Sequence, residues 1–159
     1  MTRDEFWAII DKGKSSEEPE LILEQELKQL SPASIVDFQE HFDTLFDQAY
    51  AWPLWGAAYI IGGGCSDDGF IDFRYGLISR GKEVYEKALK DPDSLANIGE
   101  EIENESFGYV AAQVYENQTE TELPYRPVPR IPDPTGDDWD FDDEEENRKR
   151  LPKLMDLFW

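Results

Sequence analysis

A stripe of apolar side chains at helical spacing, between residues 31 and 49, constrains the fold more than any other feature of this sequence. Ser31 and Pro32 open it with a preferred N-cap residue and a proline at the first helical position. One face behind them is apolar, made of Ile35, Phe38, Phe42, Leu45, Phe46 and Ala49, and the opposite face carries Asp37, Glu40, Asp43 and Asp47. The spacing predicts an amphipathic helix that needs other apolar surfaces to cover it.

Helical spacing continues along most of the chain, and no stretch shows the alternation typical of a strand. The run Thr2-Arg3-Asp4-Glu5 has the spacing of a capping box and predicts a short first helix. Further helices are expected at about residues 18–30, 53–61, 68–90 and 102–117. The length of the chain suits one core, so we predict an all-α fold, a single-domain bundle of about six helices.

The C-terminal third has a different character. Five prolines between residues 124 and 134 are too dense for a helix or a central strand and predict an extended arm. An acidic run follows the prolines, and the chain ends in a short apolar segment that is typical of a closing helix. We therefore divide the chain into a helical core (1–122), a Pro-rich and acidic extended arm (123–146) and a closing helix (147–159).

The formal net charge is −21, and residues 91–146 hold 18 acidic residues against two basic ones. A field of this sign repels phosphate backbones and anionic lipids, so we expect no nucleic-acid partner and no membrane association. It favours encounter with a basic protein partner, although the same charge also serves solubility. The N-terminus lacks the pattern of a signal peptide, which favours a cytoplasmic location.

The single cysteine and the single histidine limit the kinds of catalytic and metal site that the chain can form. Cys65 and His41 are the only residues of their types, which excludes an internal disulfide, a thiol zinc cluster and a two-histidine metal site. A nucleophilic relay would have to pass through His41, and a packed thiol is the simpler interpretation of Cys65. We expect no cofactor and no metal site.

Carboxylates at a predicted helix start form one candidate site. Asp67, Asp68 and Asp72 follow a run of glycines, and Arg74 and Tyr59 could reach them if the packing allows it. Paired carboxylates can share a proton or hold a divalent ion. Acidic residues in the first turn of a helix also interact favourably with the helix dipole, and this simpler interpretation stays open.

Aromatic residues form a second group of candidates. Trp52 lies at a helix break beside Pro53, where we expect it near the surface. Trp139 and Phe141 lie within the acidic run and could form an exposed anchor for a partner. The alternative is that these rings belong to the core.

The middle of the chain resembles a known sequence pattern. Tyr50-x-Trp52-x-Leu54-Trp55-Gly56-Ala57-Ala58-Tyr59 leads into Gly63-Gly64-Cys65-Ser66-Asp67-Asp68, and the chain closes on Arg150-Leu151-Pro152-Lys153-Leu154. This pattern is similar to the bacterial family catalogued as domain of unknown function 4240. The resemblance implies no activity, cofactor or site residue.

Three functions remain open from the sequence. We favour a non-catalytic protein-binding or regulatory module that meets a basic protein through residues 91–146, for which an immunity or antitoxin-like inhibitor is one concrete version. The first alternative is an enzyme that uses a carboxylate cluster around Asp67, Asp68 and Asp72. The second is a structural domain that self-associates as a homodimer by burying its arm.

Overall fold

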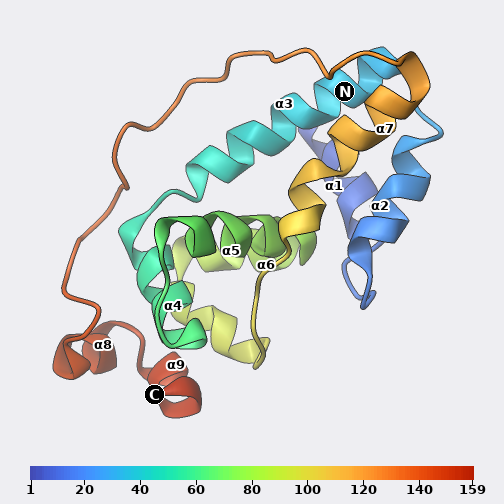
Figure 1. Ribbon diagram of the computed structural model, residues 1–159. Coiled ribbons are helices and arrows are strands. Elements are labelled where there is room, and N and C mark those ends of the chain that lie inside the picture. Colours follow the sequence, from blue (N-terminus) through green and yellow to red (C-terminus); the bar gives the residue numbers. More distant parts are fainter.

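The computed structural model describes all residues from 1 to 159 and contains helices but no strand (Figure 1). The α-helices are α1 (Arg3–Asp11), α2 (Pro19–Leu27), α3 (Pro32–Gln48), α4 (Trp52–Gly62), α5 (Asp67–Ser79), α6 (Lys82–Lys90), α7 (Val110–Thr119), α8 (Glu144–Arg150) and α9 (Pro152–Phe158). Two 3₁₀ helices, η1 (Pro92–Asn97) and η2 (Glu105–Tyr109), complete the set. The predicted all-α class is confirmed, with more and shorter helices than the six expected.

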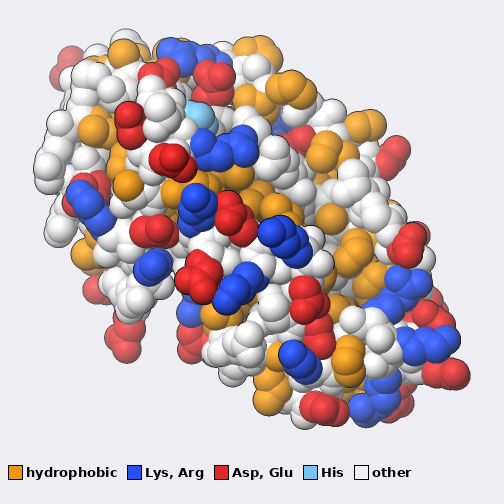
Figure 2. All heavy atoms as spheres, turned by 180° about the vertical axis from the view of Figure 1, so that it is seen from behind, with side chains coloured by type: hydrophobic (Ala, Val, Ile, Leu, Met, Phe, Trp, Pro, Cys, Tyr) orange, Lys and Arg blue, Asp and Glu red, His pale blue; other side chains and the backbone are white.

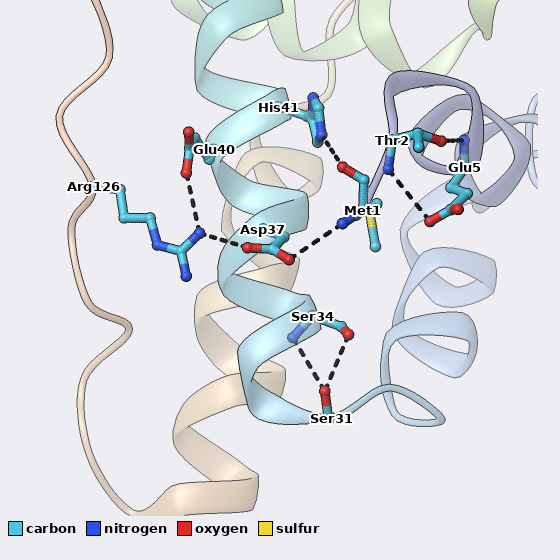
Figure 3. Close-up of polar contacts among 9 residues, drawn as sticks. All are labelled: Met1, Thr2, Glu5, Ser31, Ser34, Asp37, Glu40, His41 and Arg126. Atoms are coloured by element: carbon cyan, nitrogen blue, oxygen red, sulfur yellow. Dashed lines mark hydrogen bonds and ion pairs between the residues drawn. The ribbon is translucent and has the colours of Figure 1, made fainter.

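Local sequence signals set the helix starts. The Thr2 hydroxyl accepts a hydrogen bond from the Glu5 amide, and the Glu5 carboxylate accepts one from the Thr2 amide, which completes the predicted capping box. The Ser31 hydroxyl caps α3 by accepting from the Ser34 amide (Figure 3). Such caps satisfy amides that have no partner inside the helix.

The helix predicted over 68–90 is divided into α5 and α6. Gly81 lies between them with a φ of 96°, a conformation that side chains other than glycine rarely adopt. A β-carbon at Gly81 would lie 2.6 Å from the Asp11 carboxylate, which accepts a hydrogen bond from the Lys82 amide at 3.0 Å. The break between α5 and α6 therefore depends on a contact with Asp11 at the end of α1. Helical periodicity within residues 68–90 does not reveal this contact.

The predicted closing helix over 147–159 is wrong in its bounds. The chain forms α8 and α9 instead, separated at Leu151, whose φ of −135° and ψ of 56° are not helical. Pro152 follows directly, and a proline disfavours the helical conformation of the residue before it. The helix expected over 102–117 likewise begins as the 3₁₀ helix η2 and continues as α7.

One cluster of 29 buried apolar residues forms the core, and every helix except α8 contributes to it. Within this core the Tyr85 hydroxyl donates a hydrogen bond to the Leu45 carbonyl at 2.6 Å and so joins α6 to α3. Asp47, which we placed on the solvent side of α3, is buried. Its carboxylate accepts a hydrogen bond from the Ile131 amide at 2.8 Å, so the arm covers this part of the predicted polar face.

The arm contains no helix between Glu120 and Asp143 and runs along the outside of α3 towards α8 (Figure 1). A single parallel bridge joins Ala51 to Thr135, and Val128 is buried. The arm therefore follows the helices closely, as an extended segment held by side chains of α3. None of the helices combines the length and the hydropathy needed to cross a bilayer.

Candidate functional site

A groove of about 360 Å³ lies between α3, the η2–α7 segment and the beginning of the arm. Its walls combine tyrosine rings with carboxylates, and we call it the tyrosine groove. The lining residues are Val36, Gln39, Glu40, Asp43, Tyr75, Gly108, Tyr109, Ala112, Glu116, Glu122, Leu123, Pro124, Tyr125 and Arg126.

Three tyrosines give the groove its aromatic walls. Tyr75 is half-buried and stacks on Phe46 with ring centroids 5.0 Å apart, while Tyr109 meets its edge at 6.1 Å. Tyr109 and Tyr125 are 49% and 64% exposed, which is unusual for such large apolar side chains. Exposed tyrosine rings present both an aromatic face and a hydroxyl to a partner.

The close approach of α5 and η2 depends on a glycine. A β-carbon built on Gly108 would lie 2.5 Å from the Tyr75 ring. Only a residue without a side chain lets η2 pass over this ring. Gly108 therefore places Tyr109 directly beside Tyr75 in the groove wall.

Asp43 is the most unusual group in the groove. Burial raises the pKa of its carboxyl, and the hydrogen bond from the Gln39 amide, at 2.8 Å, together with the more distant charge of Arg130 only partly opposes this. No lysine or arginine nitrogen lies within ion-pair distance of it, nor of Glu116 or Glu122 in the same groove. A carboxylate held partly out of water without a cation in contact is destabilised, and a cation bound directly to it would relieve that cost.

Arg126 lines the groove, but its charge is already balanced. Its guanidinium pairs with both Asp37 and Glu40 on α3 (Figure 3). These contacts lower the pKa of Asp37, and the terminal ammonium of Met1 adds to this from 3.3 Å. His41 is used structurally, since its Nε2 lies 2.8 Å from the Met1 carbonyl oxygen. Arg126 thus fixes the arm to α3 and leaves the groove acidic.

The face of the molecule on which His41 reaches the surface has Lys and Arg side chains interspersed with Asp and Glu (Figure 2). The net charge of −21 is therefore not a uniform coat. In the tyrosine groove, the charged side chains that have no ion-pair partner are carboxylates.

The predicted carboxylate site does not assemble as we expected. Asp67 and Asp68 are exposed in the first turn of α5, and Asp72 is half-buried. Burial raises the pKa of Asp72, and the charges of Glu105 and Asp68 raise it further. No group of three or more His, Cys, Asp or Glu residues is placed to hold a metal ion.

The two residues that we expected to complete this site point elsewhere. The Tyr59 hydroxyl donates a hydrogen bond to Asp142 in the acidic run. The Arg74 guanidinium donates to the main-chain carbonyls of Phe46 and Phe70. Of the five residues, Asp67 and Arg74 line one cavity, whereas Tyr59 bonds to the acidic run.

The predicted anchor residues pack against α4. Trp139 and Phe141 are half-buried, and the Trp139 indole donates a hydrogen bond to the Asn147 side chain at 2.7 Å. The Trp139 ring fits where Gly56 has no side chain, since a β-carbon there would lie 2.5 Å from the ring. Trp52 is also half-buried, with its ring centroid 6.2 Å from that of Phe141. These rings attach the arm to the helices.

Cys65 is a slow nucleophile at neutral pH. Burial raises the pKa of its thiol to about 11, and Glu103, Asp67 and Asp72 add to the effect because their charges disfavour a thiolate. Compared with the ordinary value of 9.0, the thiolate fraction at pH 8 should be about 100-fold lower. We expect the reaction with a disulfide reagent to be slower by a similar factor in the folded protein than in 8 M urea. Equal rates in the two conditions would contradict this.

Few features of the sequence point to the tyrosine groove. Asp43 lies on the polar face that the spacing predicts for α3, where a carboxylate is expected to face solvent. Tyr109 and Tyr125 each carry no distinctive spacing, and they meet only because η2 and the arm return to α3. The glycine at position 108, directly before Tyr109, is the one local feature of the sequence that points to this groove.

Comparison with known proteins gives one match. The sequence profile of a family described as "Protein of unknown function (DUF4240)" matches residues 1–117, which leaves the arm and the last two helices outside the matched part. No curated protein and no solved structure shows significant similarity. Because the matched residues make up well over half of the 159, the chain belongs to the DUF4240 family.

Proposed function

We propose that this chain is a non-catalytic protein-binding module that receives a lysine or arginine side chain of a basic partner in the tyrosine groove. The observation that carries the proposal is Asp43, a partly buried carboxylate that forms no ion pair and lines the same groove as Tyr75, Tyr109 and Tyr125. An inhibitor of a basic toxin is one form that such a module could take.

The groove has the chemistry that binds a cationic side chain. Aromatic faces attract a cation by about 0.5–2 kcal/mol, more when water is excluded. Carboxylates that line the groove, from Asp43, Glu116 and Glu122, add charge-assisted hydrogen bonds. A buried cation would also lower the pKa of Asp43 towards its ordinary value, because the ionised carboxylate gains a partner.

The wider charge of the chain supports association with a basic protein. A strongly acidic molecule accelerates the encounter with a cationic partner, and this effect weakens as salt screens the charges. Tyrosine is also enriched among the residues that contribute most to binding between proteins. Tyr109 and Tyr125 lie within residues 91–146, the part of the chain that we expected to face a partner.

A fluorescein-labelled nona-arginine peptide provides a direct test by fluorescence anisotropy. We expect E116Q/E122Q to weaken binding about tenfold or more, because these charges lie in the groove, and Y109A to weaken it several-fold without any change of charge. The matched control is D133N/D138N, which removes two exposed acidic charges that make no ion pair. It should change the affinity less than about twofold.

The comparison separates a site from a general acidic surface. If both double variants weaken the peptide equally and Y109A has no effect, binding arises from net charge and the proposed groove is wrong. A fall in affinity that is specific to the groove variants, and that is largest at low salt, supports it. Circular dichroism of each variant confirms that the fold is retained.

A further inference from the structure

Arg74 is a buried cation with one side-chain nitrogen that forms no hydrogen bond within the protein. The residue is 6% exposed and lies on α5, with its guanidinium carbon 3.9 Å from the ring centroid of Phe46. It also lies 4.9 Å from the Tyr50 ring and 4.8 Å from the Phe70 ring. Burial lowers its pKa to about 10, so the group remains charged at neutral pH.

The hydrogen bonds of Arg74 leave one nitrogen free. Its Nε donates to the Phe70 carbonyl at 3.4 Å and its Nη1 to the Phe46 carbonyl at 3.2 Å. No carboxylate lies within ion-pair distance, and Nη2 has no partner within the protein. Every fully enclosed polar side-chain atom in the structure does have a partner. Nη2 is therefore not fully enclosed, and Arg74 lines a cavity.

That cavity has a volume of about 330 Å³ and is separate from the tyrosine groove. Six of its ten lining residues are apolar, and they include Tyr50, Trp55 and Phe70. Arg130 from the arm is the second cation in the wall. Asp47 is also present, but its carboxylate is already engaged by the Ile131 amide. Asp67, the other acid, is exposed.

We propose that this cavity binds a small aromatic carboxylate, with the carboxylate on Arg74 and Arg130 and the ring against Tyr50, Trp55 and Phe70. Guanidinium groups suit a planar carboxylate because they offer paired donors in one plane. An apolar cavity with a few converging polar groups is the usual form of a small-molecule site, and this volume suits a ligand of amino-acid size. The proposal rests on a different cavity from the tyrosine groove, which takes a cation, although Arg130 of this cavity bonds to Tyr125 of the groove.

The two arginines have different parts in this arrangement. Arg74 is fixed by its aromatic cage and its two carbonyl contacts, so it defines where the carboxylate binds. Arg130 is exposed and donates one hydrogen bond, from Nη2 to the Tyr125 hydroxyl at 3.3 Å. Its remaining donors are free to complete the site from the solvent side.

Benzoate is the probe, with binding followed by NMR shifts of the Trp55 indole and the Arg74 guanidinium in the intact chain. Benzamide, which has the same shape without the charge, should bind at least about tenfold more weakly, because charged hydrogen bonds are stronger than neutral ones. Inorganic phosphate should also bind more weakly, since it lacks an apolar body. Equal binding of benzamide or of phosphate would overturn the assignment of an aromatic carboxylate.

Arg130→Gln keeps the proposal testable without disturbing the core, because this side chain is exposed. We expect it to weaken benzoate about fivefold, and Arg74→Lys to weaken it about tenfold by removing the planar donor set. Arg148→Gln on α8 is the control and should leave benzoate binding unchanged. If Arg130→Gln matches that control, no carboxylate is held here. Arg130→Gln should bind the cationic peptide no more weakly than the parent chain does, so the two sites can fail separately.

Discussion

Trp139→Ala is expected to lower the free energy of unfolding by about 3 kcal/mol, at the lower end of the range for a large aromatic side chain because this ring is only half-buried. The substitution removes the ring that lies over Gly56 and the hydrogen bond to Asn147. It also removes the contact with Arg150, whose guanidinium carbon lies 4.5 Å from the Trp139 ring centroid. Urea denaturation followed by circular dichroism measures the loss.

Trp159→Ala is the matched control for this prediction. Trp159 is 51% exposed, so its removal should change the stability by less than about 0.5 kcal/mol. The pair tests whether the acidic run is part of the cooperative fold. If the two variants unfold at the same urea concentration as the parent chain, the arm is attached only loosely and Trp139 does not join it to α4.

Gly76→Ala is expected to lower the free energy of unfolding by about 2 kcal/mol, although alanine favours a helix over glycine by about 1 kcal/mol. A β-carbon at Gly76 would lie 2.8 Å from the backbone nitrogen and Cα of Glu103. These are main-chain atoms, so the 103–104 segment has to move away from α5. That movement strains the hydrogen bond from the Asn104 amide to the Asp72 carbonyl, now 3.1 Å.

Gly62→Ala serves as the control, because a β-carbon there meets no atom within 4 Å. At the end of α4 it should leave the stability unchanged or raise it by up to about 1 kcal/mol. The two substitutions are chemically identical and have opposite expected signs. A stabilising effect of Gly76→Ala would mean that the contact between α5 and the 103–104 segment is looser than the structure indicates.

The two proposed sites differ in charge and in what they would contribute. The tyrosine groove gathers unpaired carboxylates from three segments of the chain, whereas the Arg74 cavity places two arginines, together with Asp47 and Asp67, beside aromatic rings. Arg130 connects them, because it lines the cavity and bonds to Tyr125 of the groove. Binding at one site could therefore change the arm at the other, and measurement of peptide affinity with and without benzoate would detect such coupling.

Helix starts and helix faces could be predicted from the sequence wherever residues close together along the chain decide the structure. The capping box at Thr2 and the start of α3 at Ser31 both form as their spacing predicts. The apolar face of α3 is buried as its periodicity requires. These features depend on contacts within about one helical turn, which is why propensity and spacing are sufficient for them.

Contacts between distant segments decided the rest. The break at Gly81 depends on Asp11, the burial of Asp47 depends on the Ile131 amide, and Trp139 packs inward because Gly56 leaves room for it. The groove and the cavity are both made in this way, from residues on separate helices and the arm. The sequence by itself determined the helices and the composition of their faces. Only the tertiary structure decided which carboxylates lack a cation and where Arg74 opens to solvent, since both depend on which segments pack together.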